Sequence, residues 1–319
     1  MIKHLTLAAL FGCGLATAAA SQPSVVATSA GSFAEMAAMA VTMSGGDLAS
    51  LLIVMDDDDT LTQVPCSDPS SAETCQYLGG PAWYSWQESL LGSGSEYQVA
   101  QTSDDLISIS SMIFGMMDMA FTDPGIATEL AGLADGGAKM LVLTARGGSD
   151  VSPTQRQFAD LPSTVSGQSF AAFIKSNGLT SPLSGLPSVA SPVDMQGPEA
   201  SCTSQRPVTY SDGVMYVAGQ NKGTMLHCLL ARTQSSGVQN IVFLDDTLAN
   251  VTDVFTDFAG QTSGPNVLAL HYTRLEAHKA ALTVGDKADQ LQATAAARWN
   301  TLDQALTSSL LSPIPALQD

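Results

Sequence analysis

Residues 51–60 read LLIVMDDDDT: five apolar residues followed directly by four aspartates and a threonine. A short, continuous apolar run is typical of a strand that is buried on both faces of a parallel sheet. Ligands of open α/β sheets gather beyond the carboxyl ends of the strands. We therefore expect Asp56 and the residues after it to lie at a functional edge of such a sheet.

The same kind of apolar run recurs along the chain. The other candidate strands are residues 140–143, 208–210, 214–218, 240–244 and 267–272. Helical patterns lie between most of them, and this alternation predicts an α/β fold with a central parallel sheet flanked by helices. Asp212-Gly213 separates two of the runs and predicts a tight hairpin turn there.

Composition limits the class of protein. The chain has 319 residues, of which 45% are hydrophobic and 13% charged. That length suits about two domains or one large α/β domain, and the apolar content excludes wholesale disorder. Acidic residues outnumber basic ones 30 to 12, for a net charge of -18. Such a surface repels phosphate backbones and anionic lipids, so we expect no nucleic-acid partner and no electrostatic membrane docking.

The N-terminus predicts an export signal over residues 1–20. Lys3 and His4 precede an apolar stretch from Leu5 to Leu15, and residues 16–20 are small. The stretch is shorter than the ~20 residues that span a bilayer, and no later segment is predicted to do so. We expect a periplasmic or secreted protein, with a lipoprotein anchored at Cys13 as the alternative.

Four cysteines follow the predicted signal: Cys66, Cys75, Cys202 and Cys228. An even number in an exported chain favours disulfides. Cys66 and Cys75 bracket a polar loop and predict a local bond, which leaves the other two to pair by elimination. A zinc site is disfavoured because closely spaced ligand pairs are lacking.

We expect residues 21–319 to form one domain with insertions. Residues 21–45 are rich in Ala, Ser and Met and predict an amphipathic helix after a short mobile lead. Residues 65–103 and 149–205 are rich in Ser, Gly and Pro or aromatic residues and are long for simple connections. Both are candidates for a cap or lid, and the sequence leaves open which of them forms it. It also leaves the oligomeric state open.

Polar residues follow three of the predicted strands. The run at 140–143 is followed by Thr144-Ala145-Arg146-Gly147, and the run at 240–244 by Asp245-Asp246. Lys222 lies in a Gly-Gln-Asn-Lys-Gly turn before a predicted helix. Alone, the acidic pair would be a turn or a helix cap and the lysine a surface residue. An EF-hand is excluded because Leu61 stands where its loop needs glycine.

Together and in this order the residues resemble the motifs of the haloacid dehalogenase-like (HAD) superfamily of phosphohydrolases. Asp56, Asp58 and Thr60 match its Asp-x-Asp-x-Thr motif, and Thr144, Lys222 and the pair Asp245-Asp246 match the other three. The chain is also similar to an uncharacterised group of exported HAD-like proteins from Gram-negative bacteria. That likeness lies in residues 78–86, 143–147, 219–223 and 271–274 and covers most of the mature chain. The resemblance implies a Rossmann-like fold with a cap.

The resemblance also implies roles in phosphoryl transfer. Asp56 would attack phosphorus and form an aspartyl-phosphate. Asp58 would protonate the leaving oxygen and then activate water. Thr144 would bind a phosphoryl oxygen, and Lys222 would offset the charge that develops there.

The implied cofactor is Mg²⁺, which prefers oxygen ligands. Its expected ligands are Asp56 and Asp245 through their carboxylates, Asp58 through its backbone carbonyl, and Asp246 directly or through water. Residues expected near the substrate are Thr60, Trp83, Trp86 and Arg146. The two tryptophans would stack on a substrate ring or, alternatively, anchor the cap.

The expected activity is that of an Mg²⁺-dependent phosphatase that hydrolyses a small phosphomonoester. A carboxylate at Asp58 favours phosphate chemistry over dehalogenation, because the dehalogenase branch of the superfamily lacks it. The alternative is a non-catalytic surface protein that retains the fold and binds a metal or an anion. Metal-dependent release of phosphate distinguishes the two.

Overall fold

The computed structural model describes residues 22–68, 71, 74–162, 167–179, 192–193, 206–233, 235 and 237–311. The predicted signal at 1–20, including Cys13, lies outside these residues. So do Cys202 and much of the second predicted insertion. No helix in the described ranges combines the length and apolar character needed to cross a membrane.

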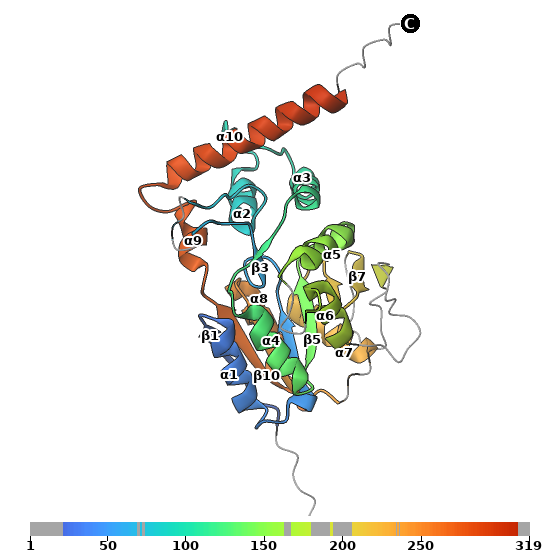
Figure 1. The fold of residues 1–319 in the computed structure, drawn as a ribbon. Coiled ribbons are helices and arrows are strands. Elements are labelled where there is room, and N and C mark those ends of the chain that lie inside the picture. Colours follow the sequence, from blue (N-terminus) through green and yellow to red (C-terminus); the bar gives the residue numbers. More distant parts are fainter. Residues whose placement is uncertain are drawn as a thin grey trace, which may run out of the picture.

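One large sheet organises the described chain (Figure 1). Its strands, in spatial order, are β1 (Val25–Ala30), β10 (Asn266–Tyr272), β9 (Asn240–Asp245), β2 (Leu51–Met55), β5 (Lys139–Thr144), β8 (Val214–Tyr216), β7 (Val208–Ser211) and β6 (Pro192–Val193). Every pairing from β1 to β8 is parallel, whereas β7 and β6 pair antiparallel with their neighbours. The α/β fold with a mostly parallel, Rossmann-like sheet is thereby confirmed.

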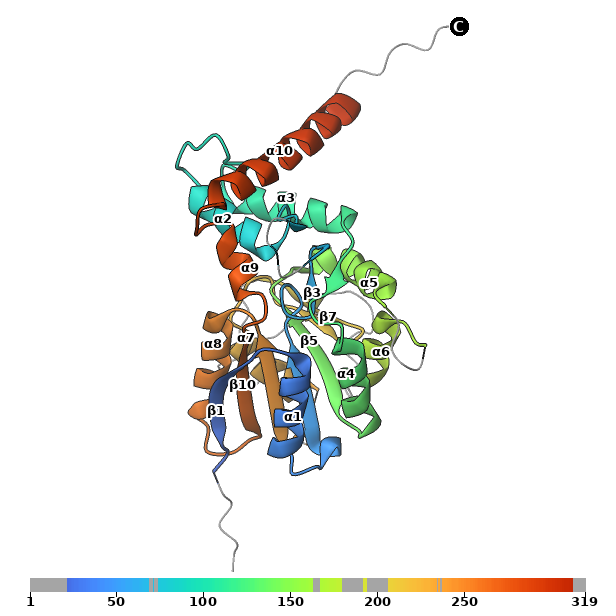
Figure 2. The ribbon, with the colours of Figure 1, turned by 60° about the vertical axis from the view of Figure 1, so that its left-hand side comes forward.

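Helices cover both faces of this sheet (Figures 1 and 2). One face packs against α1 (Phe33–Met43), α4 (Ile126–Asp135), α5 (Val151–Asp160) and α6 (Phe170–Asn177), and the other against α7 (Lys222–Arg232) and α8 (Leu248–Ala259). The central strand β2 shows why. Leu51, Ile53 and Met55 face the first layer, Leu52 and Val54 face the second, and all five are buried. A strand covered on both sides needs an unbroken apolar run.

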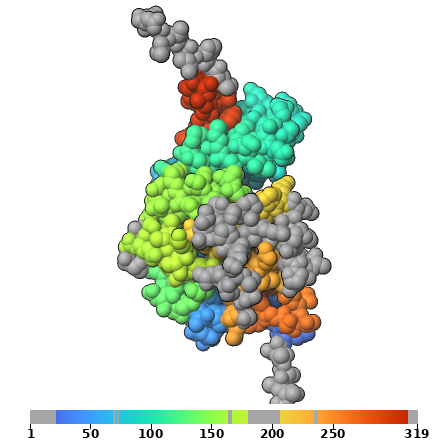
Figure 3. Space-filling view, turned by 90° about the vertical axis from the view of Figure 1, so that its right-hand side faces the viewer, coloured from blue at the N-terminus to red at the C-terminus, as the bar shows by residue number. Residues whose placement is uncertain are grey.

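Four helices form a cap at one end of the sheet: α2 (Pro81–Leu90), α3 (Ser103–Met116), α9 (Glu276–Ala281) and α10 (Ala288–Leu306), followed by a π-helical turn at Thr307–Leu311. Their contacts form a third hydrophobic cluster that includes Trp83, Leu106, Ile113 and Leu291. In Figure 3 the cap lies at one end of the molecule, and α3 contacts α5 below it. The cap thus combines α2, from the predicted insertion at 65–103, with α3, which extends beyond the predicted end of that insertion, and with the C-terminal helices. The described part of residues 149–205 instead contains α5 and α6, which pack on the sheet.

Short elements link cap and core. The antiparallel strand pair β3 (Thr62–Gln63) and β4 (Ala120–Phe121) joins the two chain segments that lead to and from α2 and α3. The 3₁₀ turn η1 (Leu48–Ser50) precedes β2, and η3 (Gly148–Asp150) follows β5. The disulfide between Cys66 and Cys75 closes the loop before α2, as the sequence predicts. Cys228 is also disulfide-bonded.

The expectation of one helix over residues 21–45 is wrong in its first part. Val25–Ala30 form the edge strand β1, which pairs in parallel with β10. The helix begins only at Phe33, after Ser32, whose hydroxyl accepts a hydrogen bond from the Glu35 backbone amide at 3.2 Å. Paired β-branched residues favour a strand here, and the serine cap fixes where the helix begins.

Candidate functional site

The carboxyl ends of β2 and β9 bring three predicted carboxylates together. Asp56 follows β2, Asp245 ends β9, and Asp246 follows it; all three are buried. The Asp56 amide donates to the Leu244 carbonyl at 2.9 Å, which ties the two strand ends together. One oxygen from each carboxylate lies within 4.8 Å of the others.

Lys222 lies between two of these carboxylates. Its ammonium donates to Asp56 Oδ1 and, at 2.7 Å, to Asp245 Oδ2, and the side chain is 1% exposed. Lys222 is the first residue of α7, whose N-cap is Asn221. The next residue must be small: a Cβ at Gly223 would meet the Asp253 carbonyl oxygen at 2.6 Å. Glycine therefore lets α7 approach α8 closely enough to place the lysine.

Thr60 and Asn250 hold the carboxylates in place. Thr60 Oγ1 donates to Asp56 Oδ2 at 3.4 Å or Asp246 Oδ1 at 3.3 Å, and it accepts the Asp246 backbone amide at 3.0 Å. Asn250 Nδ2 donates to both oxygens of Asp245 at 3.1 Å. The expectation that Thr60 contacts substrate is not met, because its side chain is fully buried among these groups.

Asp58 is bound by Arg146 rather than by the carboxylate cluster. Arg146 Nε and Nη2 donate to the two oxygens of Asp58 at 2.8 and 2.7 Å, a bidentate ion pair. The same guanidinium donates through Nη1 to Thr154 and Gln157 and lies 4.5 Å from the ring centroid of Phe114. Arg146 lines the cleft but is engaged on all sides, so it is a structural clamp here rather than a free substrate ligand.

Thr144 ends β5 as predicted and is 1% exposed. Its hydroxyl accepts the Arg146 backbone amide at 3.2 Å. The residue does not line the cleft described below; its neighbours Ala145 and Arg146 do. The structure therefore puts Thr144 at the predicted strand end, with its hydroxyl turned to the Arg146 backbone.

The other two aspartates of the run form the turn after β2. The Asp57 carbonyl accepts the amides of Thr60, Leu61 and Thr62, and its carboxylate accepts the Thr62 hydroxyl at 2.7 Å. Asp59 adopts a left-handed φ of 59°, which aspartate tolerates better than most residues. Both side chains are buried. Burial raises the pKa of Asp57 to about 6, against the opposing charge of Arg146.

The electrostatics of this region favour a bound cation. Burial raises the pKa of Asp56 well above its ordinary value; Lys222 opposes this, and the neighbouring carboxylates add to it. Burial and Asp245 likewise raise the pKa of Asp246. Among the described residues, six carboxylates gather here against three cations. The acids are Asp56, Asp57, Asp58, Asp59, Asp245 and Asp246, and the cations are Lys222, Lys279 and Arg146. Buried negative charge in excess, presented as oxygen ligands, fits a divalent cation such as Mg²⁺.

A cleft of about 740 Å³ opens over these residues. Asp56, Asp58, Lys222 and Asp246 lie on its floor, and residues of the cap helices α2 and α3 form a wall. The cap residues in that wall are Pro81, Tyr84, Ser85, Asp104, Ile107, Ser110, Ser111 and Phe114. This volume suits a small molecule.

Trp83 and Trp86 do not line the cleft. Both are buried inside the cap, 0% and 4% exposed, where they pack in its hydrophobic cluster. The expectation that they stack on a substrate is therefore not met, and the alternative, that they anchor the cap, agrees with the structure. Tyr84, between them on α2, faces the cleft instead, because residues two apart on a helix point in different directions.

Lys279 is a site residue that no sequence motif indicates. It lies on α9, and its ammonium pairs with Asp246 Oδ2. His271, at the end of β10, places Nε2 3.1 Å from the Asp246 carbonyl oxygen. A single lysine on a short helix has no sequence signal that separates it from a surface residue. Only the packing of the cap brings it to the carboxylates.

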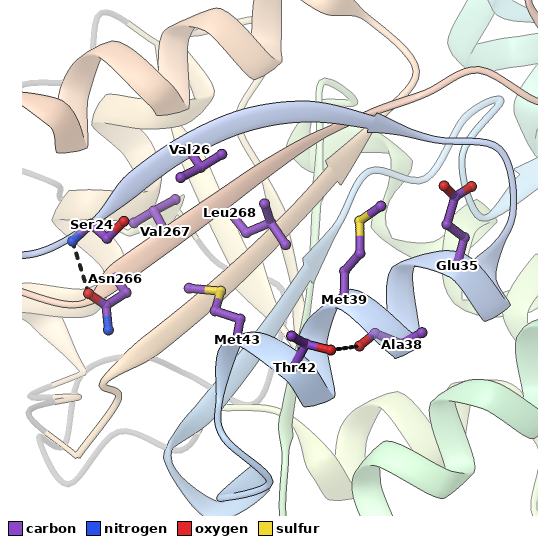
Figure 4. A pocket seen from close by; sticks show the side chains of 10 residues that line it. All are labelled: Ser24, Val26, Glu35, Ala38, Met39, Thr42, Met43, Asn266, Val267 and Leu268. Atoms are coloured by element: carbon purple, nitrogen blue, oxygen red, sulfur yellow. Dashed lines mark hydrogen bonds between the residues drawn. The ribbon is translucent and has the colours of Figure 1, made fainter.

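A second hollow, of about 690 Å³, lies between α1, β1 and β10 (Figure 4). Its lining is mostly apolar, including Val26, Met39 and Leu268. Glu35, the titratable residue of this lining, accepts the Gly31 amide at 2.8 Å. The hollow therefore lacks the converging charged groups that make the capped cleft the candidate site.

The fold and the cleft define a capped α/β protein with a buried acidic cluster at the carboxyl edge of its sheet. By sequence the chain belongs to the family described as Protein of unknown function (DUF2608), whose model matches residues 32–311. The chain matches no curated protein and no solved structure.

Proposed function

We propose that the chain is an HAD-like, Mg²⁺-dependent phosphatase that hydrolyses small phosphomonoesters through an aspartyl-phosphate on Asp56. One observation carries the proposal: Asp56 lies on the floor of a capped cleft, paired with a buried lysine, while Asp58 lines the same cleft two residues later. A carboxylate, a cation and a second carboxylate are the groups that this chemistry requires.

Each residue has a distinct role in the proposal. An Asp56 oxygen forms a bond to phosphorus as the bond to the leaving oxygen breaks, and Asp58 gives that oxygen a proton. Asp58 then takes a proton from water, whose oxygen attacks phosphorus and frees Asp56. Lys222, held against Asp56, offsets the negative charge that gathers on the phosphoryl oxygens.

Asp56, Asp245 and Asp246 would hold Mg²⁺, since one oxygen of each lies within 4.8 Å of the others. The ion would neutralise charge on the transferring group. Asn250 and Thr60 keep these carboxylates in place before the ion binds. Because residues of α2 and α3 form one wall of the cleft, the cap would select among small substrates.

The test is phosphate release from p-nitrophenyl phosphate by the mature chain, with Mg²⁺ and with EDTA. We expect release with Mg²⁺, and its loss by at least a hundredfold in Asp56→Asn and Asp58→Asn. Asp135→Asn, an exposed aspartate at the end of α4, is the matched control and should keep wild-type activity. Release that survives both cleft substitutions would refute the proposed roles.

A second candidate function is metal or anion binding without turnover. It is favoured by the bidentate pair between Arg146 and Asp58, which engages both oxygens of the proposed acid and base. Calorimetric Mg²⁺ binding by a well-folded chain that releases no phosphate would support this function against the first.

Export is part of the proposal and depends on residues 1–20. In a Gram-negative host we expect the protein in the periplasm or medium, with Ser21 as its first residue. N-terminal sequencing of the fractionated protein checks this, and an uncleaved chain in the cytoplasm would contradict it.

A further inference from the structure

Gln157 joins the cap to the ion pair of Arg146 and Asp58. It lies on α5 and is 1% exposed. Its Oε1 accepts from Arg146 Nη1 at 2.7 Å. Its Nε2 donates to the carbonyls of Phe114 and Met117, at 2.9 and 3.1 Å. The side-chain amide of Gln157 therefore binds Arg146 through its oxygen and the end of α3 through its nitrogen.

The carbonyls that Gln157 binds belong to the C-terminal end of α3. The last carbonyls of a helix have no partner within the helix and need one from outside. Gln157 supplies that partner from the core, and Arg156 adds a bond from Nη2 to the Met117 carbonyl at 2.7 Å. The ring of Phe114 covers the Arg146 guanidinium. The contacts of Gln157 and Phe114 therefore hold α3 on the core and hold Arg146 in position at the same time.

The other contacts of Arg146 are few and specific. Nε and Nη2 donate to Asp58, and Nη1 donates to Gln157 and Thr154 and lies 3.3 Å from Asp57 Oδ2. A guanidinium is a planar, rigid fork, so fixing Nη1 also fixes the edge that faces Asp58. Loss of the Gln157 contact removes one of the two side chains that orient this fork from α5. Thr154 and Asp57 would still hold Nη1, but the fork, and with it the Asp58 carboxylate that it binds, would be less firmly oriented.

We propose that Gln157 is a positioning residue for the proposed phosphatase reaction. It binds both the C-terminal end of α3 and Arg146, so the orientation of the Asp58 carboxylate depends on the contact between α3 and the core. This inference rests on the proposed function. Acid–base transfer at Asp58 then depends on closure of the cap, although Gln157 itself touches neither substrate nor metal. The coupling runs through Gln157 and Arg146, which are both buried and hydrogen-bonded to each other.

The test compares Gln157→Met with Gln155→Met. Gln155 lies on the same helix and is also hydrogen-bonded, but its partners are Ser211 Oγ at 3.0 Å and Asp212 Oδ2 at 3.3 Å rather than Arg146. With p-nitrophenyl phosphate and Mg²⁺, Gln157→Met should lower kcat about tenfold and leave KM within twofold. Gln155→Met should change neither. Equal losses in the two variants would mean a general effect of helix α5 and would overturn the inference.

A double-mutant cycle separates positioning from a merely structural role. If Gln157 acts through Asp58, adding Gln157→Met to Asp58→Asn should cost little further activity, less than twofold. A further tenfold loss in that background would overturn the inference. Arg146→Lys keeps the charge but not the fork, and should lower kcat at least as much as Gln157→Met.

Hydrogen exchange supplies a readout that does not depend on turnover. Gln157→Met should speed exchange of the α3 amides at least fivefold, whereas Gln155→Met should leave them unchanged. Unchanged α3 exchange in Gln157→Met would refute the link to the cap. A wild-type chain that releases no phosphate would instead refute the proposed function. Phosphate release by Gln157→Met at the wild-type rate would refute the inference but not the proposed function.

Discussion

Lys222 offers the sharpest prediction about what holds the acidic cluster together. Lys222→Met keeps a side chain of similar length but removes the ammonium that pairs with Asp56 and Asp245. Lys222 is 1% exposed, and so water cannot take over the lost contacts. Breaking a buried pair by removing one partner costs about 3–5 kcal/mol. That is a large part of the ~5–15 kcal/mol that stabilises a typical domain.

The cost should depend on pH, and its sign follows from Asp56. Burial raises the pKa of Asp56 in the folded chain, and Lys222 is the main influence that lowers it. Loss of Lys222 therefore raises that pKa further above its unfolded value. A group whose pKa is higher in the folded state binds protons more strongly there, so stability falls as pH rises. The deficit of Lys222→Met should accordingly be larger at pH 8 than at pH 5.

Urea unfolding followed by circular dichroism measures this effect. At pH 8 we expect the free energy of unfolding to fall by about 3–5 kcal/mol, and added Mg²⁺ to restore part of it by replacing the lost charge. Lys139→Met, at the exposed start of β5, is the control and should change the free energy by less than about 0.5 kcal/mol. A Lys222→Met chain as stable as wild type, at pH 8 and without metal, would show that Lys222 does not stabilise the acidic cluster.

Three further substitutions probe the cap and the approach of α7. Lys279→Met should lower the free energy of unfolding by only about 1 kcal/mol, because the lysine side chain is 27% exposed. It should also speed hydrogen exchange in α9, and unchanged exchange would contradict the contact between α9 and Asp246. Cys75→Ser removes the disulfide that closes the loop between two cysteines nine positions apart, and the free energy of unfolding in urea should fall by about 2–3 kcal/mol. A stability that changes neither in this variant nor in wild type with reductant would contradict this. Gly223→Ala should lower phosphate release at least tenfold, because the added Cβ would push α7 away from α8. Gly132→Ala is the control: an added Cβ meets open space there, and phosphate release should not change.

The sequence predicts the central sheet well because burial on both faces leaves a strong signal. The runs that became β2, β5, β9 and β10 are nearly continuous apolar stretches, and Asp212-Gly213 marks the hairpin of β7 and β8. The edge strand β1 lacks this signal, because four of its six residues are exposed and several are Ala or Ser. Such a segment is easily mistaken for the start of the helix that follows it.

The sequence predicts only those residues of the candidate site that belong to the motifs. Asp56, Lys222, Asp245 and Asp246 meet because strand ends of a parallel sheet share one edge. Lys279 reaches them from the far end of the chain, which no local pattern encodes. The same holds for the cap, since its cluster joins the residues of α2 and α3 to those of α10. The tryptophans were ambiguous because an aromatic residue suits a cap core as well as a substrate wall.

The most direct test of the central claim is to trap the aspartyl-phosphate. Wild-type chain is mixed with p-nitrophenyl phosphate and Mg²⁺, quenched in acid, and digested for peptide mass spectrometry. We expect one added phosphoryl group on the peptide that contains Asp56, absent with EDTA and absent in Asp56→Asn. Phosphate release without this adduct on Asp56, or an adduct that persists in Asp56→Asn, would contradict it.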